Sequence, residues 1–93
     1  MTVKRYIRKQ ILTPPVRAIQ WTGNNMLDIS DFVRSSLNYE ATFTIKNNKW
    51  ELCIRDCSYS STEYKRSNYV VKEGDHFFPV SKESFNDGYE LDE

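Results

Sequence analysis

Glycine and long apolar runs are scarce in this chain of 93 residues. Its three glycines are too far apart to form the glycine-rich loop that cradles a nucleotide phosphate. No apolar stretch approaches the ~20 residues that a membrane-spanning helix needs. No apolar segment follows the basic N-terminus, as one does in a secretory signal. These absences exclude a phosphate-binding loop and predict a soluble cytoplasmic protein without a membrane span.

Cysteine and histidine are equally scarce. Cys53 and Cys57 are the only cysteines, and disulfide frameworks belong to cysteine-dense secreted chains, so we expect both thiols to be reduced. With His76, the only histidine, they are too few for a zinc site, which needs about four ligands. A catalytic nucleophile needs a base and an orienting group beside it, and the spacing indicates no such trio. We therefore predict no metal, no cofactor and no enzymatic activity.

Aromatic residues, by contrast, are abundant, with two Trp, six Tyr and five Phe. A chain of this length has room for one domain, and so small a domain must share one core among its elements. A few buried aromatic rings stabilise such a core, because each removes a large apolar area from water. The balance of 39% hydrophobic and 28% charged residues is typical of a globular protein. We predict a single domain over residues 1–93.

Charge is balanced overall but unevenly distributed. The formal net charge is zero, yet residues 1–21 carry five basic residues and no acid, and residues 67–93 carry seven acids against two lysines. Such polarity indicates either a basic face for nucleic acid or two termini that lie near each other and neutralise one another. Because the basic residues do not form an unbroken cluster, we favour the second explanation.

The first part of the chain predicts an extended segment, a strand and a helix. Residues 1–14 lead into paired prolines, which favour an extended backbone. Residues 16–21 (VRAIQW) are typical of a strand, and apolar side chains on parts of both faces indicate a central or helix-covered strand. From Met26 to Leu37 apolar residues recur every three to four positions, which predicts a helix of about three turns capped by Asn25.

Hairpins are predicted for most of the remaining chain. Residues 41–45 and 50–54 alternate apolar and polar side chains around a polar turn, which favours a hairpin with one buried face. Residues 69–72 and 76–80 flank a glycine and predict a second hairpin, whose later strand contains Pro79 and so belongs at a sheet edge. Residues 57–68 are polar and compatible with either a long loop or an edge strand.

The C-terminus is predicted to add a short helical turn. Ser81 is a suitable cap for this turn, and Phe85 is expected to point inward. Residues 89–91 fit a last short strand that leads into an acidic tail at residues 90–93. The predicted fold is therefore of the α+β class: a small antiparallel β-sheet of about five strands packed on one α-helix, with a short C-terminal helical turn.

Two segments carry a resemblance to a known family. The first is residues 15–25 (PVRAIQWTGNN), and the second is residues 69–79 (YVVKEGDHFFP), followed by Phe85 and Tyr89. Together they resemble a family of short, mostly uncharacterised proteins encoded in tailed-phage and prophage genomes. Those proteins typically carry AIQWTG near the start and a GDYIIKG–GEFYP-like pattern near the end. Here Ser67-Asn68 stands in place of the usual Gly-Asp, and Val80 in place of the usual Cys.

The resemblance covers the two ends of the chain and leaves residues 38–67 outside it. The shared positions are mostly apolar, turn-forming or β-branched, so they imply a fold more directly than a function. The resemblance implies a phage origin and an accessory role, and it supplies no catalytic residue. The middle segment is where we expect a specific binding surface to differ between relatives.

Nucleic-acid binding is one hypothesis for that surface. Aromatic side chains on a sheet with basic residues at its rim stack single-stranded bases. The alternative is that the tyrosines pack over the sheet edge, and zero net charge favours this alternative because it gives no general attraction to phosphates. The candidate platform consists of Tyr59, Tyr64, Lys65 and Arg66, beside the N-terminal cations Lys4, Arg5, Arg8 and Lys9.

Protein binding fits more of the middle segment. Residues 38–67 combine Tyr, Trp, Arg and Ser with few bulky aliphatics, and Tyr, Trp and Arg are enriched in interface hot spots. An exposed edge strand also pairs readily with another chain, including a second copy in a homodimer. The candidate partner-binding residues are Trp50, Arg55, Tyr59, Tyr64, Lys65 and Arg66.

We therefore expect a small phage or prophage accessory protein that binds a host protein stoichiometrically. The expected target is a defence component such as a CRISPR nuclease complex, which the protein would inhibit by occlusion; this step rests on analogy with other small phage proteins. Two alternatives are a nucleic-acid-associated protein and an oligomeric sponge that holds a small ligand in an aromatic pocket between copies.

Overall fold

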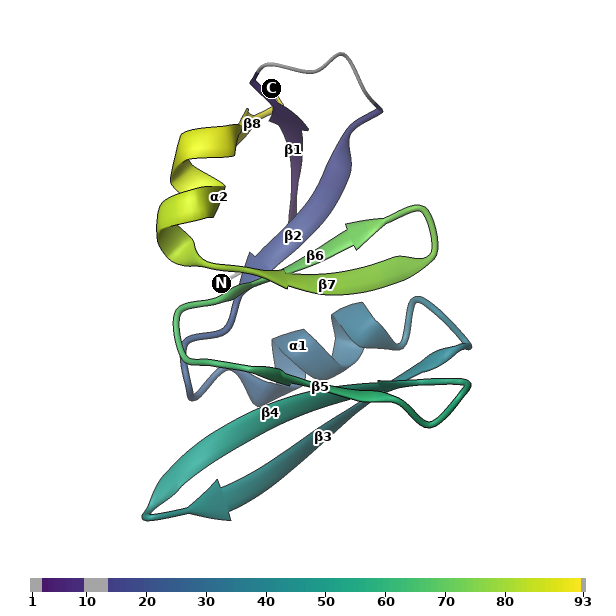
Figure 1. Ribbon diagram of the computed structural model, residues 1–93, viewed down its shortest axis with the longest axis vertical. Coiled ribbons are helices and arrows are strands. Elements are labelled where there is room, and N and C mark those ends of the chain that lie inside the picture. Colours follow the sequence, from purple (N-terminus) through teal and green to yellow (C-terminus); the bar gives the residue numbers. More distant parts are fainter. Residues whose placement is uncertain (1–2, 10–13, 93) are drawn as a thin grey trace.

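The computed structural model describes residues 3–9 and 14–92, which form two antiparallel sheets and two helices (Figure 1). The α+β class predicted from the sequence is confirmed. A sheet of five strands is present, but three further strands form a second sheet that the sequence pattern did not indicate. In chain order the elements are β1 (Lys4–Arg8), β2 (Val16–Gln20), α1 (Met26–Val33), β3 (Tyr39–Lys46), β4 (Lys49–Asp56), β5 (Ser61–Tyr64), β6 (Tyr69–Glu73), β7 (His76–Val80), α2 (Lys82–Gly88) and β8 (Tyr89–Leu91).

The five-stranded sheet has the order β7-β6-β2-β1-β8, with β2 at its centre. The apolar residues on both faces of β2 explain this position. Val16 and Ala18 pack in the cluster that contains Phe85 of α2, whereas Ile19 packs in the cluster around α1. Pro79, which cannot donate a backbone hydrogen bond, lies in the edge strand β7 as predicted.

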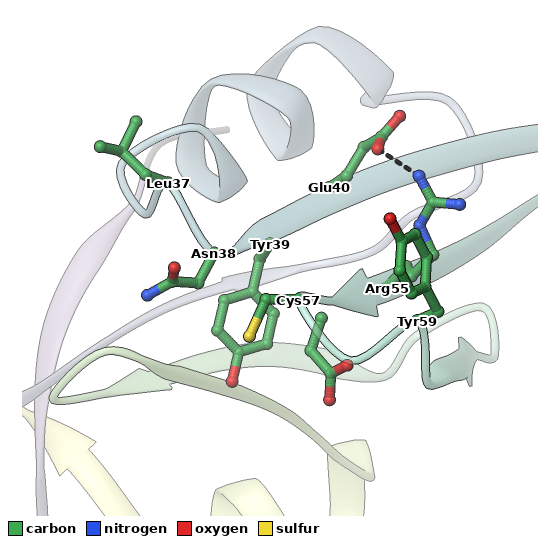
Figure 2. A pocket seen from close by; sticks show the side chains of 8 residues that line it. Leu37, Asn38, Tyr39, Glu40, Arg55, Cys57 and Tyr59 are labelled. Carbon is green, nitrogen blue, oxygen red and sulfur yellow. Dashed lines mark hydrogen bonds and ion pairs between the residues drawn. The ribbon is translucent and has the colours of Figure 1, made fainter.

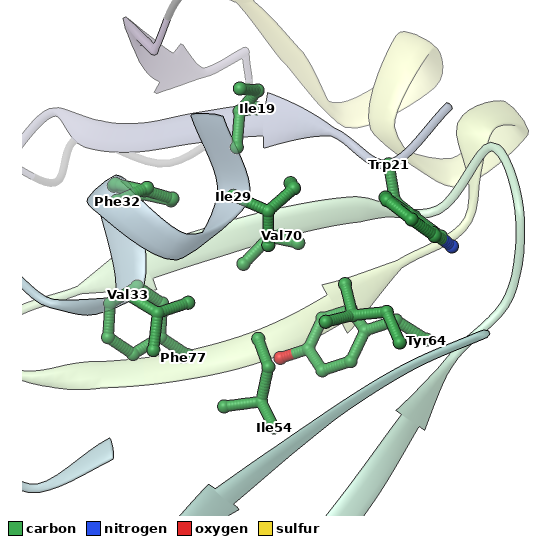
Figure 3. Close-up of a cluster of buried hydrophobic side chains, with 10 residues drawn as sticks. Ile19, Trp21, Ile29, Phe32, Val33, Ile54, Tyr64, Val70 and Phe77 are labelled. Atoms are coloured by element: carbon green, nitrogen blue, oxygen red, sulfur yellow. The ribbon is translucent and has the colours of Figure 1, made fainter. Parts of the chain in front are cut away.

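The larger core joins the two sheets through α1 (Figure 3). Trp21, which follows β2, is only 1% exposed, and its ring lies 5.7 Å from that of Phe43 in β3. This tryptophan therefore ties the end of the central strand to the three-stranded sheet. The buried members of this core are Ile19, Trp21, Ile29, Phe32, Val33, Leu52, Ile54, Tyr64, Val70 and Phe77.

A second, smaller core lies on the other face of the five-stranded sheet, under α2. Phe85 stacks between Tyr69 and Tyr89, with ring centroids 3.9 and 4.7 Å away. Ser81 caps α2, because its hydroxyl oxygen accepts a hydrogen bond from the Ser84 amide at 3.2 Å. The predicted cap and the inward position of Phe85 are both confirmed.

Helix α1 begins after Asn25, as predicted, but the predicted side-chain cap is not formed. Instead Asn25 Oδ1 accepts a hydrogen bond from the Thr22 amide at 3.0 Å, and its Nδ2 donates to the Gln20 carbonyl at 2.8 Å.

Helix α1 is also shorter than predicted. It ends at Val33, and Leu37, which was expected to continue the apolar stripe, is 101% exposed. Both the amide and the hydroxyl of Ser35 donate hydrogen bonds to the Phe32 carbonyl, at 3.2 and 2.6 Å. Serine bonds of this kind compete with helical ones, so the chain continues in turns. In the described part of the chain, no helix is long and apolar enough to cross a membrane.

Both predicted hairpins are confirmed. β3 and β4 pair along their whole length, and Asn47 and Asn48 join them with φ of 54° and 63°, the left-handed conformation that a two-residue turn requires. β6 and β7 pair across a turn in which Gly74 has φ of 62°. Residues 57–68 contain β5, which pairs with β4, so this segment is an edge strand flanked by turns rather than one long loop.

The two ends of the chain lie side by side, because β1 pairs with both β2 and β8. Arg5 lies 3.3 Å from Asp92, and Arg8 lies 2.8 Å from Glu73. The basic start and the acidic end therefore neutralise one another, as favoured from the sequence. Of the predicted extended segment, residues 4–8 form β1, and residues 1–2 and 10–13 lie outside the described residues, as does residue 93 of the predicted acidic tail.

Candidate functional site

A hollow of about 500 Å³ lies where β3 begins and β4 ends (Figure 2). One wall is the turn between α1 and β3, and the opposite wall is the turn between β4 and β5. We call it the Tyr59 hollow. Its lining residues are Leu37, Asn38, Tyr39, Glu40, Arg55, Asp56, Cys57 and Tyr59.

The Asp56 carboxylate organises the turn that carries Tyr59. One of its oxygens accepts hydrogen bonds from the Ser58 hydroxyl (2.7 Å), the Ser58 amide (2.9 Å) and the Ser60 amide (3.1 Å). These bonds, with that of the Ser58 hydroxyl foremost, hold the pKa of Asp56 below its usual range. Tyr59 itself has φ of 66°, a conformation that a bulky residue adopts only when its surroundings impose it.

The Tyr59 side chain is 79% exposed, but its ring contacts a neighbouring side chain. The Arg55 guanidinium lies 5.4 Å from the centre of its ring, within the range of a cation–π contact. Glu40 holds that guanidinium in turn, with its carboxylate oxygen 2.6 Å from Arg55 Nη2 (Figure 2). The hollow therefore presents an exposed tyrosine ring beside an ion pair.

The wall formed by the turn between α1 and β3 is hydrogen-bonded to the five-stranded sheet. Asn38 Nδ2 donates a hydrogen bond to Asp75 at 2.9 Å, and the Tyr39 hydroxyl lies 3.1 Å from His76 Nδ1. Hydrogen bonds, first from Ser36 and then from Asn38, lower the pKa of Asp75. Leu37, between Ser36 and Asn38, projects its side chain into solvent. Both walls of the hollow are thus positioned by specific polar contacts.

A second hollow, of about 230 Å³, lies on the side of the three-stranded sheet where Trp50 is found. Trp50 is 39% exposed, and the 62% exposed Ile45 is its partner in the β3–β4 register. The Arg66 side chain packs over Gly23: a Cβ placed on this glycine would lie 2.5 Å from Arg66 Nε. We call it the Trp50 hollow, and its lining residues are Trp21, Lys49, Trp50, Glu51, Glu63, Tyr64, Lys65 and Arg66.

The structure divides the six predicted partner-binding residues between these two hollows. Arg55 and Tyr59 line the first, and the other four line the second. The prediction that Tyr64 offers a contact surface is wrong, because its side chain is only 2% exposed and packs in the larger core. Its strand alternates so that Tyr64 faces the core beside its register partner Leu52. The predicted platform of two exposed tyrosines is therefore not formed.

Sequence reasoning missed Leu37 and the Glu40–Arg55 pair. Leu37 was assigned to the apolar stripe of the helix, and the serines at positions 35 and 36 were the signal that the helix ends before it. Glu40 and Arg55 face each other in the β3–β4 register. Counting outward from the two-residue turn would have found this pair.

The N-terminal cations proposed for nucleic acid mostly contact the chain itself. Arg5 and Arg8 hold the ion pairs described above, and Arg8 also lies 5.6 Å from the centre of the Tyr89 ring. Lys9 Nζ donates to the Asn86 carbonyl at 2.9 Å, and Lys4 is exposed at the start of β1. Only Lys4 among these four lacks such a contact in the described residues.

Among the described residues, no base lies beside either cysteine to activate its thiol. Both are free, and burial, followed by the negative charges of Glu63 and Glu51, raises the pKa of Cys53. Cys57 is exposed in the Tyr59 hollow, while the ring of His76 is engaged with Tyr39. Within residues 3–9 and 14–92, no three His, Cys, Asp or Glu side chains gather as metal ligands.

No protein-family model, curated protein or solved structure matches the chain. The geometry of the described residues is therefore the basis for assigning a function.

Proposed function

We propose that this protein is a small phage or prophage accessory protein that binds a host protein stoichiometrically, with the Tyr59 hollow as its contact surface. The phage origin rests on the resemblance of residues 15–25 and 69–79 to phage-encoded proteins. The binding role rests on the hollow, where an exposed tyrosine, an arginine and an exposed leucine lie together. Tyrosine and arginine are the residue types that dominate the energetics of protein interfaces.

The observation that carries this proposal is the conformation of Tyr59. A left-handed backbone costs a non-glycine residue about 1–2 kcal/mol, and the Asp56 network stabilises it while leaving the ring in solvent. A residue whose backbone is held in place before binding loses less conformational entropy when its ring enters a partner's pocket. Backbone strain of this kind is typical of functional sites. The turn thus presents a pre-organised anchor for a partner.

The polar groups of the hollow support binding rather than catalysis. Glu40 pairs with Arg55, and the Asp56 carboxylate is occupied by serine and backbone donors. These groups are engaged in holding the surface in shape. We propose that the bound target is a component of a bacterial defence system, such as a CRISPR nuclease complex inside the host cell, and that binding inhibits it.

Affinity capture from lysate of a susceptible bacterial host tests this function. Tagged protein is incubated with lysate at low and high salt, and retained molecules are identified by mass spectrometry. We expect one dominant host protein at near-equimolar yield at both salt concentrations, because burial of the exposed Tyr59 and Leu37 side chains does not depend on charge. Turnover of a substrate by the purified protein, with no retained host protein, would contradict the proposal.

A second candidate function, single-stranded nucleic-acid binding, is favoured by one observation. The Trp50 hollow places a half-exposed indole among Lys49, Lys65 and Arg66, and base stacking beside cations is the usual mode of such binding. Glu51 and Glu63 line the same hollow and offset part of this charge. Quenching of tryptophan fluorescence by an oligonucleotide, weakening steeply with salt and absent in Trp50→Ala, would support this candidate.

A further inference from the structure

Strand β3 is a long edge strand with a free side. The three-stranded sheet has the order β3-β4-β5, so β3 pairs only with β4 among the described residues. It runs for eight residues at the outer border of the molecule (Figure 1). Natural edge strands are usually short, bulged, interrupted by proline or charged. β3 is eight residues long, pairs with β4 without a bulge and contains no proline, and its charged residues, Glu40 and Lys46, lie near its two ends. Its free side is therefore open to pairing.

The turn at Asn47–Asn48 determines which backbone groups face that free side. In a two-residue turn of this kind, the carbonyl of the first flanking residue accepts from the amide of the second, so Lys46 and Lys49 form a hydrogen-bonded pair. Such pairs alternate along an antiparallel ladder. The amides and carbonyls of Ala41, Phe43 and Ile45 therefore point away from β4, toward the open edge.

The sequence of β3 (YEATFTIK) is complementary to itself when reversed about Phe43. In an antiparallel pairing centred there, Glu40 lies opposite Lys46 of a second copy, and Thr42 lies opposite its Thr44. These side chains share the solvent face of the sheet. On the core face, Ala41 lies opposite the exposed Ile45 of the second copy. Opposite charges and Thr–Thr contacts are favourable cross-strand pairs.

We infer that two copies of this chain associate through β3 in this register and form one continuous sheet with the strand order β5-β4-β3-β3-β4-β5. The two-fold axis passes between the Phe43 residues and is perpendicular to the sheet. Every pair joins residues on the same face, so the core face of one copy continues into that of the other. The outward amides and carbonyls of Ala41, Phe43 and Ile45 are then all paired.

This dimer also brings the second copy to the Tyr59 hollow. Because the strands are antiparallel, the Asn47–Asn48 turn of the second copy lies beside the start of β3. Asn47 of the second copy is opposite Tyr39, which lines the hollow, and its Lys46 is next to the Glu40–Arg55 pair. Each hollow is then bordered by both chains. This dimer is proposed independently of the host-protein function. The two proposals are also tested separately, because self-association is measured on the purified chain alone.

Two charge-reversal variants test this register. Mixing the two variants makes the test specific for the proposed pairing of Glu40 with Lys46. Glu40→Lys places two lysines opposite each other at both ends of the pairing, and Lys46→Glu places two glutamates there. When the two variants are mixed, the heterodimer places opposite charges at both ends again. Lys82→Glu on the exposed start of α2 is the matched control. Sedimentation across micromolar to millimolar concentration gives the dimer dissociation constant of each sample.

We expect the wild type and Lys82→Glu to dimerise alike, and each single β3 variant to have a dissociation constant raised at least about tenfold. The equimolar mixture is expected to recover most of the wild-type affinity, which also shows that both variants are folded. A wild type that stays monomeric up to millimolar concentration would overturn the inference. So would a mixture that dimerises no better than its two components.

Discussion

The two sheets of this small protein differ in how much of their surface is covered. The five-stranded sheet is packed on both faces, by the α1 core on one side and by α2 on the other. In the described part of the chain, the three-stranded sheet is packed on one face only. Ile45 and Trp50 are exposed at one of its ends, and Tyr59 is exposed in the turn at the other end. We therefore expect a division of roles, in which the first sheet supplies most of the stability and the second supplies the proposed contact surfaces.

The two tryptophans offer the strongest test of this division. Trp21→Ala is expected to lower the free energy of unfolding by about 3–5 kcal/mol, because a large ring that joins the two sheets is removed from the core. Trp50→Ala is expected to cost about 1 kcal/mol or less, because its side chain is already partly in water. Urea unfolding followed by circular dichroism measures both. Equal losses would contradict the proposed difference between the sheets.

Tyr64 carries a buried polar group that lies in the larger core. Its hydroxyl is buried without a hydrogen-bond partner among the described residues, and burial, the main cause, raises the pKa of this side chain. A buried polar group left unpaired costs about 1–3 kcal/mol. We therefore expect Tyr64→Phe to raise the free energy of unfolding by about 1 kcal/mol, measured by urea unfolding. A loss of similar size would show that the hydroxyl has a partner.

The five-stranded sheet should contribute a pH dependence through Arg8 and Glu73. The bidentate bonds from Arg8 lower the pKa of Glu73, so the folded state binds fewer protons than the unfolded state. This stabilisation is present above the ordinary glutamate pKa of about 4 and is lost as pH falls below it. Arg8→Gln should lower the melting temperature more at pH 7 than at pH 3, where mainly the contacts of Arg8 with Tyr89 remain to be lost.

The size of this effect is small, because both side chains are partly exposed and such pairs are screened by solvent. Lys4→Gln, which removes a charge on the same strand that has no such carboxylate partner among the described residues, is the control. A melting temperature of Arg8→Gln that differs from the wild type equally at pH 7 and pH 3 would contradict the role assigned to Glu73.

The local elements of the fold could be predicted from the sequence, whereas their assembly could not. Gly74, Pro79 and Ser81 each have a strong local preference, and each is found where that preference predicts. Nothing in the alternation of residues 41–45 and 50–54 says whether the hairpin joins the strand at 16–20 or forms a separate sheet. That choice depends on α1 filling the space between the sheets, which is a matter of packing rather than of local pattern.

The candidate site was only partly predictable for a related reason. Tyr59 and Arg55 were identified by residue type, but a tyrosine in a polar segment is compatible with both burial and exposure. The strand register decides between them, and it turns Tyr64 inward while the Asp56 network turns Tyr59 outward. The exposure of Leu37 was not predicted, because its spacing continues that of the preceding helix. The hydrogen bonds of Ser35 to Phe32 and of the Ser36 amide to Val33 mark the early end of that helix.

The most direct test of the Tyr59 hollow as a contact surface is to measure stability and host-protein binding separately in a Tyr59 variant. Tyr59→Gly removes the ring and suits the left-handed backbone, so we expect the free energy of unfolding to stay within about 1 kcal/mol of the wild type. Retention of the captured host protein should nevertheless fall at least about tenfold, as for an interface hot spot. Leu27→Ser, which alters an exposed leucine of α1 outside the hollow, should retain it fully. If Tyr59→Gly is folded and retains the host protein as well as the wild type does, the hollow is not the contact surface.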